Sequence, residues 1–149
     1  MGLRDNLKNI IDDQQRAADE AAERAKREAA IARAKSLDTA IKSFCRLLDE
    51  GTVQEIIEHH IKSIRGMRVV VLGCSRDRAV IYLDPESNVP RQFPLDIEFN
   101  ADPFVMNEAI ESVEVQAAIE ALKKEGVIVT AGREQGNGAI RVTLDYRNI

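Results

Sequence analysis

A chain of 149 residues is long enough for one domain with an appendage, and its hydrophobic share of 44% is ordinary for a globular protein. Aromatic residues make up only 4% of the chain, so a surface that stacks the bases of single-stranded nucleic acid is not expected. The apolar runs are too short to cross a bilayer and no apolar signal segment opens the chain. We therefore expect no membrane partner, and a location in the cytoplasm or within a virus particle.

The net charge of -4 is unevenly distributed along the chain. Residues 1–48 carry ten basic and eight acidic groups, whereas residues 84–120 carry nine acidic groups and a single arginine. One acidic block on a nearly neutral background is not typical of a phosphate-binding face. The block instead predicts a surface, represented by Asp96 and Glu98, that meets a basic protein partner.

The first 37 residues predict one long helix. Leu3, Leu7, Ile10 and Ile11 are spaced for one helical face, and residues 12–37 contain no glycine or proline and are rich in strong helix formers. Steps of four and three residues then mark a heptad seam. The seam residues are Ile11, Gln15, Ala18, Ala22, Ala25, Ala29 and Ala32.

The alanines of the seam stabilise helix association only weakly, because each CH₂-sized group that is buried contributes only about 0.8 kcal/mol. Its alanines do let two helix backbones approach closely. We therefore predict that Ala18, Ala22, Ala25, Ala29 and Ala32 pack against a second copy of the chain or against a partner. Two alternatives stay open at this point, a solvated lone helix and a nucleic-acid-binding arm.

A compact domain is predicted over residues 38–149. Ser36 or Asp38 can cap a new helix over 39–50, and Thr52–Glu55 has the pattern of a capping box that begins a second helix over 52–65. Gly66 is a suitable residue to end that helix.

The next segments predict strands. "MRVVVLG" and "AVIYLD" flank a polar turn at Cys74–Arg78 and indicate a hairpin, after which Pro85, Pro90 and Pro94 mark a loop or a sheet edge. "LDIEF" alternates apolar and polar residues and predicts a further strand. Asp102–Pro103 begins a helical segment that reaches Glu125, with a break expected near Ser112. The segments "VIVTA" and "AIRVTLDY" predict a final hairpin.

These elements together predict an α+β fold. A long, Ala-rich N-terminal helix precedes a compact domain of helices packed on a mostly antiparallel sheet of about five strands. A helix followed by a hairpin occurs twice, first after Thr52 and again after Ser112, with Gly66 and Gly126 at the corresponding helix ends.

The candidates for chemistry are all explained more simply as structure. His59 and His60 are adjacent on a helix, point about 100° apart and cannot share one metal ion from a single face, so partly exposed helix histidines are expected. Arg76 and Arg78 can lower the pKa of Cys74, but the spacing of a phosphate-cradling thiol loop is absent. "AGREQGNG" precedes a strand and not a helix, which favours a hairpin turn over a phosphate loop.

The acidic residues between Asp84 and Asp102 have no calcium-loop spacing. They comprise Asp84, Glu86, Asp96, Glu98 and Asp102. We expect no metal, no cofactor and no enzymatic activity.

A helix over 113–125 followed by a hairpin over 127–146 also has the order of a winged helix. In that alternative Lys123, Lys124, Arg133 and Arg141 face phosphates, and Gln135 and Asn137 join Arg133 at the tip of the wing.

The main hypothesis is a non-enzymatic interaction or assembly protein that self-associates or docks on a partner through its N-terminal helix, in keeping with a viral or mobile-element component that is structural or inhibitory. The winged-helix DNA-binding regulator is the alternative.

Overall fold

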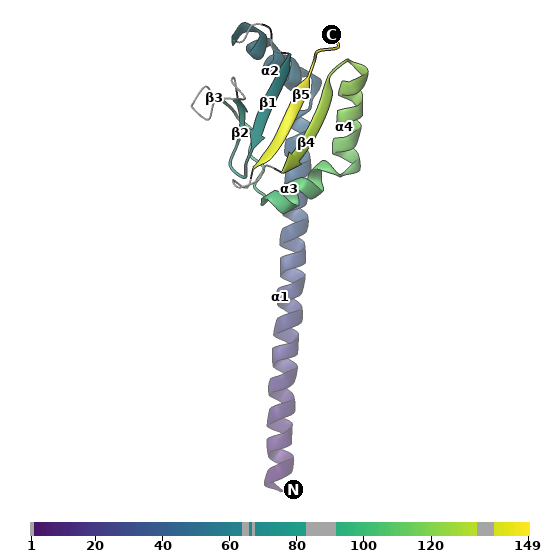
Figure 1. Ribbon diagram of the computed structural model, residues 1–149. Helices are drawn as coiled ribbons and strands as arrows, with labels where there is room; N and C mark the ends of the chain where they lie inside the picture. The colour runs from purple at the N-terminus through teal and green to yellow at the C-terminus, as the bar shows by residue number, and fades with distance from the viewer. Residues whose placement is uncertain (1, 64–65, 67, 83–91, 134–138) are drawn as a thin grey trace. The chain divides into compact units, whose positions relative to one another are not determined.

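The structure is a computed structural model that describes residues 2–63, 66, 68–82, 92–133 and 139–149, with the backbone alone described for 92–94 (Figure 1). The chain divides into two units, Met1–Lys35 and Ser36–Ile149. This division lies two residues before the boundary that the sequence predicts.

The first helix, α1, runs without a break over Leu3–Leu47. The predicted N-cap at Ser36 or Asp38, and with it the start of a separate helix at residue 39, is therefore wrong. A capping residue ends a helix only where the backbone also turns, and no glycine or proline forces a turn here. Asp38 instead forms an ion pair with Lys42, one helical turn further along, with 2.9 Å between the carboxylate oxygen and Nζ.

The second helix, α2, covers Glu50–Ser63 and begins two residues before the predicted capping box. Thr52 consequently lies within the first turn and caps nothing. Asp49 precedes the helix, where its carboxylate accepts from the backbone N–H of Gly51 at 3.2 Å and its carbonyl accepts from Val53 at 2.9 Å. The prediction that Gly66 ends this helix is consistent with its left-handed backbone, whose φ is 87°.

The described residues form one five-stranded antiparallel sheet in the order β3-β2-β1-β5-β4. The strands are β1 (Val69–Cys74), β2 (Ala79–Tyr82), β3 (Gln92–Leu95), β4 (Ile128–Arg133) and β5 (Ile140–Asp145). Each predicted hairpin pairs as expected, β1 with β2 and β4 with β5, while β5 also pairs with β1 and joins the two hairpins. The predicted α+β fold is confirmed.

The strand predicted at "LDIEF" is wrong, because only Leu95 of this segment belongs to β3. Ile97 and Phe99 are buried while Asp96 and Glu98 are exposed, so the alternation in the sequence reflects burial of an extended segment without a paired ladder. The strand itself lies earlier and includes Pro94, which is tolerated because β3 is at the edge of the sheet. Pro85 and Pro90 lie outside the described residues.

Two short helices lie between the hairpins, α3 (Pro103–Ile110) and α4 (Val113–Lys124). Asp102 caps α3 and Ser112 caps α4, each side chain accepting from a backbone N–H three residues later. The break near Ser112 is therefore confirmed. Gly126 adopts a φ of 92° and ends α4 in a Schellman motif.

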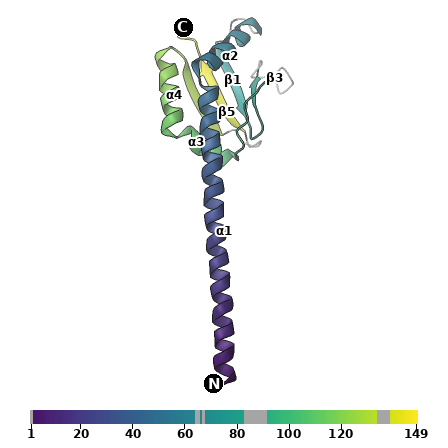
Figure 2. The same cartoon turned by 180° about the vertical axis from the view of Figure 1, so that it is seen from behind.

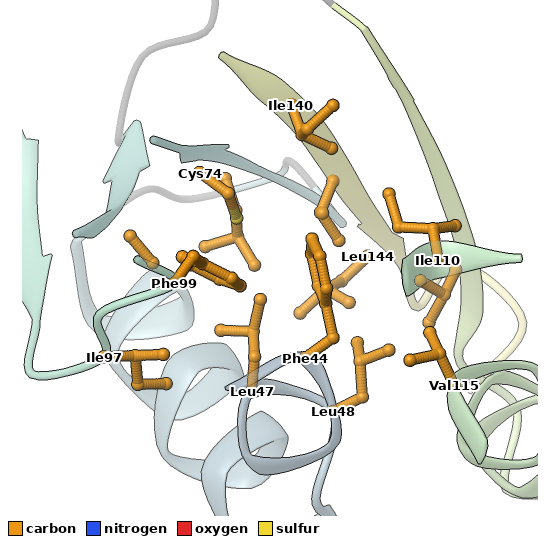
Figure 3. Packing of buried hydrophobic residues seen from close by; sticks show 14 of the residues in the cluster. Phe44, Leu47, Leu48, Cys74, Ile97, Phe99, Ile110, Val115, Ile140 and Leu144 are labelled. Carbon is orange, nitrogen blue, oxygen red and sulfur yellow. The ribbon is translucent and has the colours of Figure 1, made fainter. Parts of the chain in front are cut away.

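The core lies on one face of the sheet, beneath the end of α1, α3 and α4 (Figure 2). Phe44 and Leu47 point from α1 toward Phe99 and the strands (Figure 3), and the rings of Phe44 and Phe99 are 4.6 Å apart between centroids. These residues belong to the second unit, so the C-terminal part of α1 is built into the domain that it precedes.

No helix in the described part of the chain is both long enough and apolar enough to span a membrane.

Candidate functional site

The predicted partner-binding alanines lie on the part of α1 that belongs to the first unit. Among the described residues α1 is the sole element of this unit, so the unit has no second layer against which the helix can pack. Every residue over 2–35 is accordingly exposed. The seam residues among them are Ala18, Ala22, Ala25, Ala29 and Ala32.

The surface around the seam is charged and makes contacts within the helix. Arg27 lies 3.4 Å from Glu23, and the Gln15 amide donates to Asp19 at 3.1 Å. Both contacts are exposed, and pairs of this kind contribute about 0.3–0.5 kcal/mol at most. They support the helix but do not cover the alanines.

The N-terminal end of α1 carries larger apolar side chains that the sequence analysis placed on one helical face but did not count as partner-binding residues. Leu3 is 74% exposed and Ile11 is 64% exposed. Leu3, Leu7 and Ile11 line a shallow groove together with Arg4 and Lys8. Contiguous exposed apolar surface is characteristic of interaction sites, so these residues extend the candidate surface. Their four-residue spacing already indicates a shared helical face.

Asp96 and Glu98, the predicted acidic contacts, are both exposed. They flank the buried Ile97, and the Ser43 hydroxyl donates to the Glu98 carbonyl. Their segment is therefore held by the core of the second unit while both carboxylates face solvent. They belong to the second unit, whereas the alanine seam belongs to the first.

The remaining acidic residues do not enlarge this surface. Asp84 and Glu86 lie outside the described residues. Asp102 accepts from the backbone N–H of Val105 at 2.9 Å and so has a structural role as the cap of α3.

The four basic residues of the winged-helix alternative are not gathered on one face. Lys123 and Lys124 form the last turn of α4, which packs on the core side of the sheet. Arg141 alternates with the buried residues of β5 and so lies on the opposite side. Arg133 is placed over the Phe104 ring, 4.3 Å from its centroid. The nucleic-acid interface stays a prediction.

The turn that the sequence predicts within "AGREQGNG" falls largely at residues 134–138, outside the described residues. Gln135 and Asn137, two of the proposed wing-tip residues, lie there as well. The described residues Arg133 and Ile140 pair as the last rung of the β4–β5 ladder, as expected for a hairpin that continues across this turn.

The two histidines are placed differently from each other. His60 is fully buried, which corrects the expectation of partial exposure, and its Nδ1 lies 2.8 Å from the Tyr146 hydroxyl. Burial lowers the pKa of His60, and the neighbouring His59 lowers it further. Among the described residues no group of three potential metal-ligating side chains comes together.

Cys74 is the last residue of β1 and is fully buried. Burial raises the pKa of its thiol to about 12, which is opposite to the lowering that nearby Arg76 and Arg78 predict. A thiol in this state is a packing residue and not a nucleophile.

A cavity of about 310 Å³ opens beside α2 and α4 in the second unit. It is lined by Glu50, Val53, Gln54, Ile57, Glu58, Leu122, Glu125, Val127 and Ile149. No local sequence pattern indicates this cavity, because its walls come from segments far apart in the chain. Its volume is at the lower end of the range for small-molecule sites.

No protein-family model matches this chain, and comparison with curated proteins and with solved structures finds no match either.

Proposed function

We propose that this protein is a non-enzymatic interaction protein whose N-terminal helix self-associates or docks on another protein. The observation that carries the proposal is that every residue of α1 up to Lys35 is exposed, including Leu3, Leu7 and Ile11. A helix with no layer of its own to pack on gains most of its stability when a second element covers its apolar face.

The chemistry of the second unit supports a non-enzymatic role. The thiol of Cys74 is buried at a raised pKa, and the imidazole of His60 is enclosed and paired with Tyr146. Neither group is presented to a substrate. The exposed groups of interest, Asp96 and Glu98, are suited to contacts with a partner.

Sedimentation velocity of the full chain tests self-association. We expect a species heavier than the 16.6 kDa monomer, in proportions that depend on concentration. The double substitution of Ala22 and Ala25 by Glu buries carboxylates in the seam and should return the chain to a monomer. The matched control replaces Ala30 and Ala34 by Glu, which adds the same charge outside the seam and should leave association unchanged.

If the wild-type chain is monomeric at every concentration, self-association is excluded and docking on another protein is tested directly. A pull-down from the native source then compares the wild-type chain with the same two variants. The proposal requires a partner that the Ala30/Ala34 variant retains and the Ala22/Ala25 variant loses. Equal recovery by all three chains would rule out the helix face as the binding site.

A further inference from the structure

Charge along residues 12–35 of α1 is divided into two blocks of equal length and opposite sign. Residues 12–23 carry five acidic groups and one basic group, and residues 24–35 carry five basic groups and one acidic group. All of these residues are exposed. A second copy lying parallel and in register places like-charged blocks together, whereas an antiparallel copy places each block against its opposite.

The part of the seam over residues 15–32 has the same centre as the charge reversal, between residues 23 and 24. When Ala22 lies opposite Ala25 of an antiparallel second copy, Ala18 lies opposite Ala29 and Gln15 lies opposite Ala32. The same alignment brings residues 12–23 opposite residues 24–35. The alanines do not decide whether the two helices run parallel or antiparallel, since small residues permit close approach in both orientations. The charged residues favour the antiparallel orientation.

The residues that flank the seam agree with this alignment. The positions directly after Ile11 and the three alternate seam alanines are Asp12, Asp19, Lys26 and Arg33. In an antiparallel pair such positions face each other across the interface, and charged residues at them set the orientation of coiled helices. Asp19 then faces Lys26 of the second copy and Asp12 faces Arg33, and two-fold symmetry repeats both contacts.

We infer that α1 pairs antiparallel with α1 of a second copy over residues 12–35, with the Ala22–Ala25 layer at its centre. This inference rests on the proposed function. It specifies that the partner of α1 is a second copy of the same helix and that the two helices run antiparallel. Since the two-fold axis passes through the charge reversal, the pair closes as a dimer and exposes no unpaired charged block.

Disulfide trapping in the full chain tests the orientation. Ala18→Cys and Ala29→Cys are prepared separately in a Cys45→Ser background, one of them labelled with ¹⁵N so that the three dimers differ in mass. The same background without an added cysteine reports any linkage through Cys74. The mixture is oxidised after the chains have exchanged.

The antiparallel pair predicts the mixed 18–29 disulfide, in roughly tenfold excess over the two homodisulfides. Two copies of residue 18 are separated by eleven residues along the helix axis, or about 16 Å, beyond disulfide reach. Homodisulfides alone would overturn the antiparallel inference while self-association stood. A monomer in sedimentation with no linked product would instead overturn both self-association and this inference, and would leave docking on another protein as the part of the proposed function still to be tested.

Charge reversal provides an independent test. Asp19→Lys and Lys26→Asp each place like charges across the interface twice, so each should raise the dissociation constant by roughly tenfold at low salt. The chain with both substitutions should return to within about threefold of wild type. Glu20→Lys and Arg27→Glu, on the outer side of the helix, are the matched controls. Equal weakening by inner and outer reversals, or no recovery in the double variant, would overturn the inference.

Discussion

His60 is the one polar side chain that is fully buried in the described part of the chain. Its Nδ1 lies 2.8 Å from the Tyr146 hydroxyl and its ring meets the Tyr146 ring edge-on, while its Nε2 is buried without a hydrogen-bond partner among the described residues. A protonated ring in this position places a charge in the core with one N–H unsatisfied. The fold therefore depends on the neutral form of this histidine.

The lowered pKa of His60 predicts a loss of stability in mild acid. As pH falls, the unfolded chain takes up a proton near the ordinary histidine value of 6.5, before the folded chain does. The contribution to stability is thus complete above pH 6.5 and declines below it, by at most about 1.4 kcal/mol per pH unit, until the folded-state pKa is passed. Urea unfolding between pH 7.5 and 5 measures this slope.

The control for the acid effect is His60→Asn, whose amide can still meet the Tyr146 hydroxyl but does not titrate. Carboxylates contribute equally to both chains, so the difference in slope isolates His60. Identical slopes for the wild type and His60→Asn would contradict the prediction. His59→Asn, which changes the half-buried neighbour, should retain most of the wild-type slope.

Burial of Cys74 predicts a thiol that is inert while the chain is folded. With its pKa raised to about 12, roughly one thiol in ten thousand is ionised at pH 8, and the side chain is also inaccessible to reagents. In a Cys45→Ser chain we expect a thiol reagent to label Cys74 at least roughly a hundredfold more slowly in the folded than in the unfolded state. Comparable rates in the two states would show that Cys74 is accessible.

At the scale of elements, similar residues act as caps or as ordinary helical residues according to their backbone. Asp102 has an extended conformation and caps α3, whereas Asp38 lies within α1. We expect Asp102→Ala to cost about 1 kcal/mol in the free energy of unfolding, and Asp38→Ala to change it by less than about 0.5 kcal/mol. Urea titrations of both variants provide the comparison. An equal cost at the two positions would imply a cap at Asp38.

The sequence predicts elements best where local chemistry decides them. Asp102, Ser112 and Gly126 mark helix ends that the backbone confirms, and β5 alternates as expected along its whole length. Prediction from local sequence fails where contacts with distant parts of the chain determine which residues form a strand. The alternation around Ile97 implies a strand, yet the ladder lies earlier, over Gln92–Leu95, because β2 pairs there.

At the scale of the whole molecule, the order of the strands was not predictable from the sequence. Nothing local indicates that β5 pairs with β1, or that β3 and β4 form the two edges. The candidate surface was predictable in part, since heptad spacing identified the alanines. Their exposure and the exposed Leu3–Ile11 end depend on what the rest of the chain leaves uncovered, which spacing alone does not reveal.

The division into two units predicts two separate thermal transitions. Tyr82 and Tyr146, the two tyrosines of a chain without tryptophan, both belong to the second unit, so near-ultraviolet circular dichroism reports on that unit alone. Far-ultraviolet circular dichroism reports on both units. Residues 3–35 have no core of their own, so their helix should melt broadly and at a lower temperature than the tyrosine signal.

Protein concentration identifies the cause of the first transition. If association stabilises the N-terminal helix, mass action raises the midpoint of the far-ultraviolet transition with concentration and leaves the tyrosine transition in place. The Ala22→Glu and Ala25→Glu double variant should remove this dependence, and the Ala30→Glu and Ala34→Glu control should keep it. Coincident transitions at every concentration would contradict the prediction, because the helix would then unfold as part of one cooperative unit with the domain.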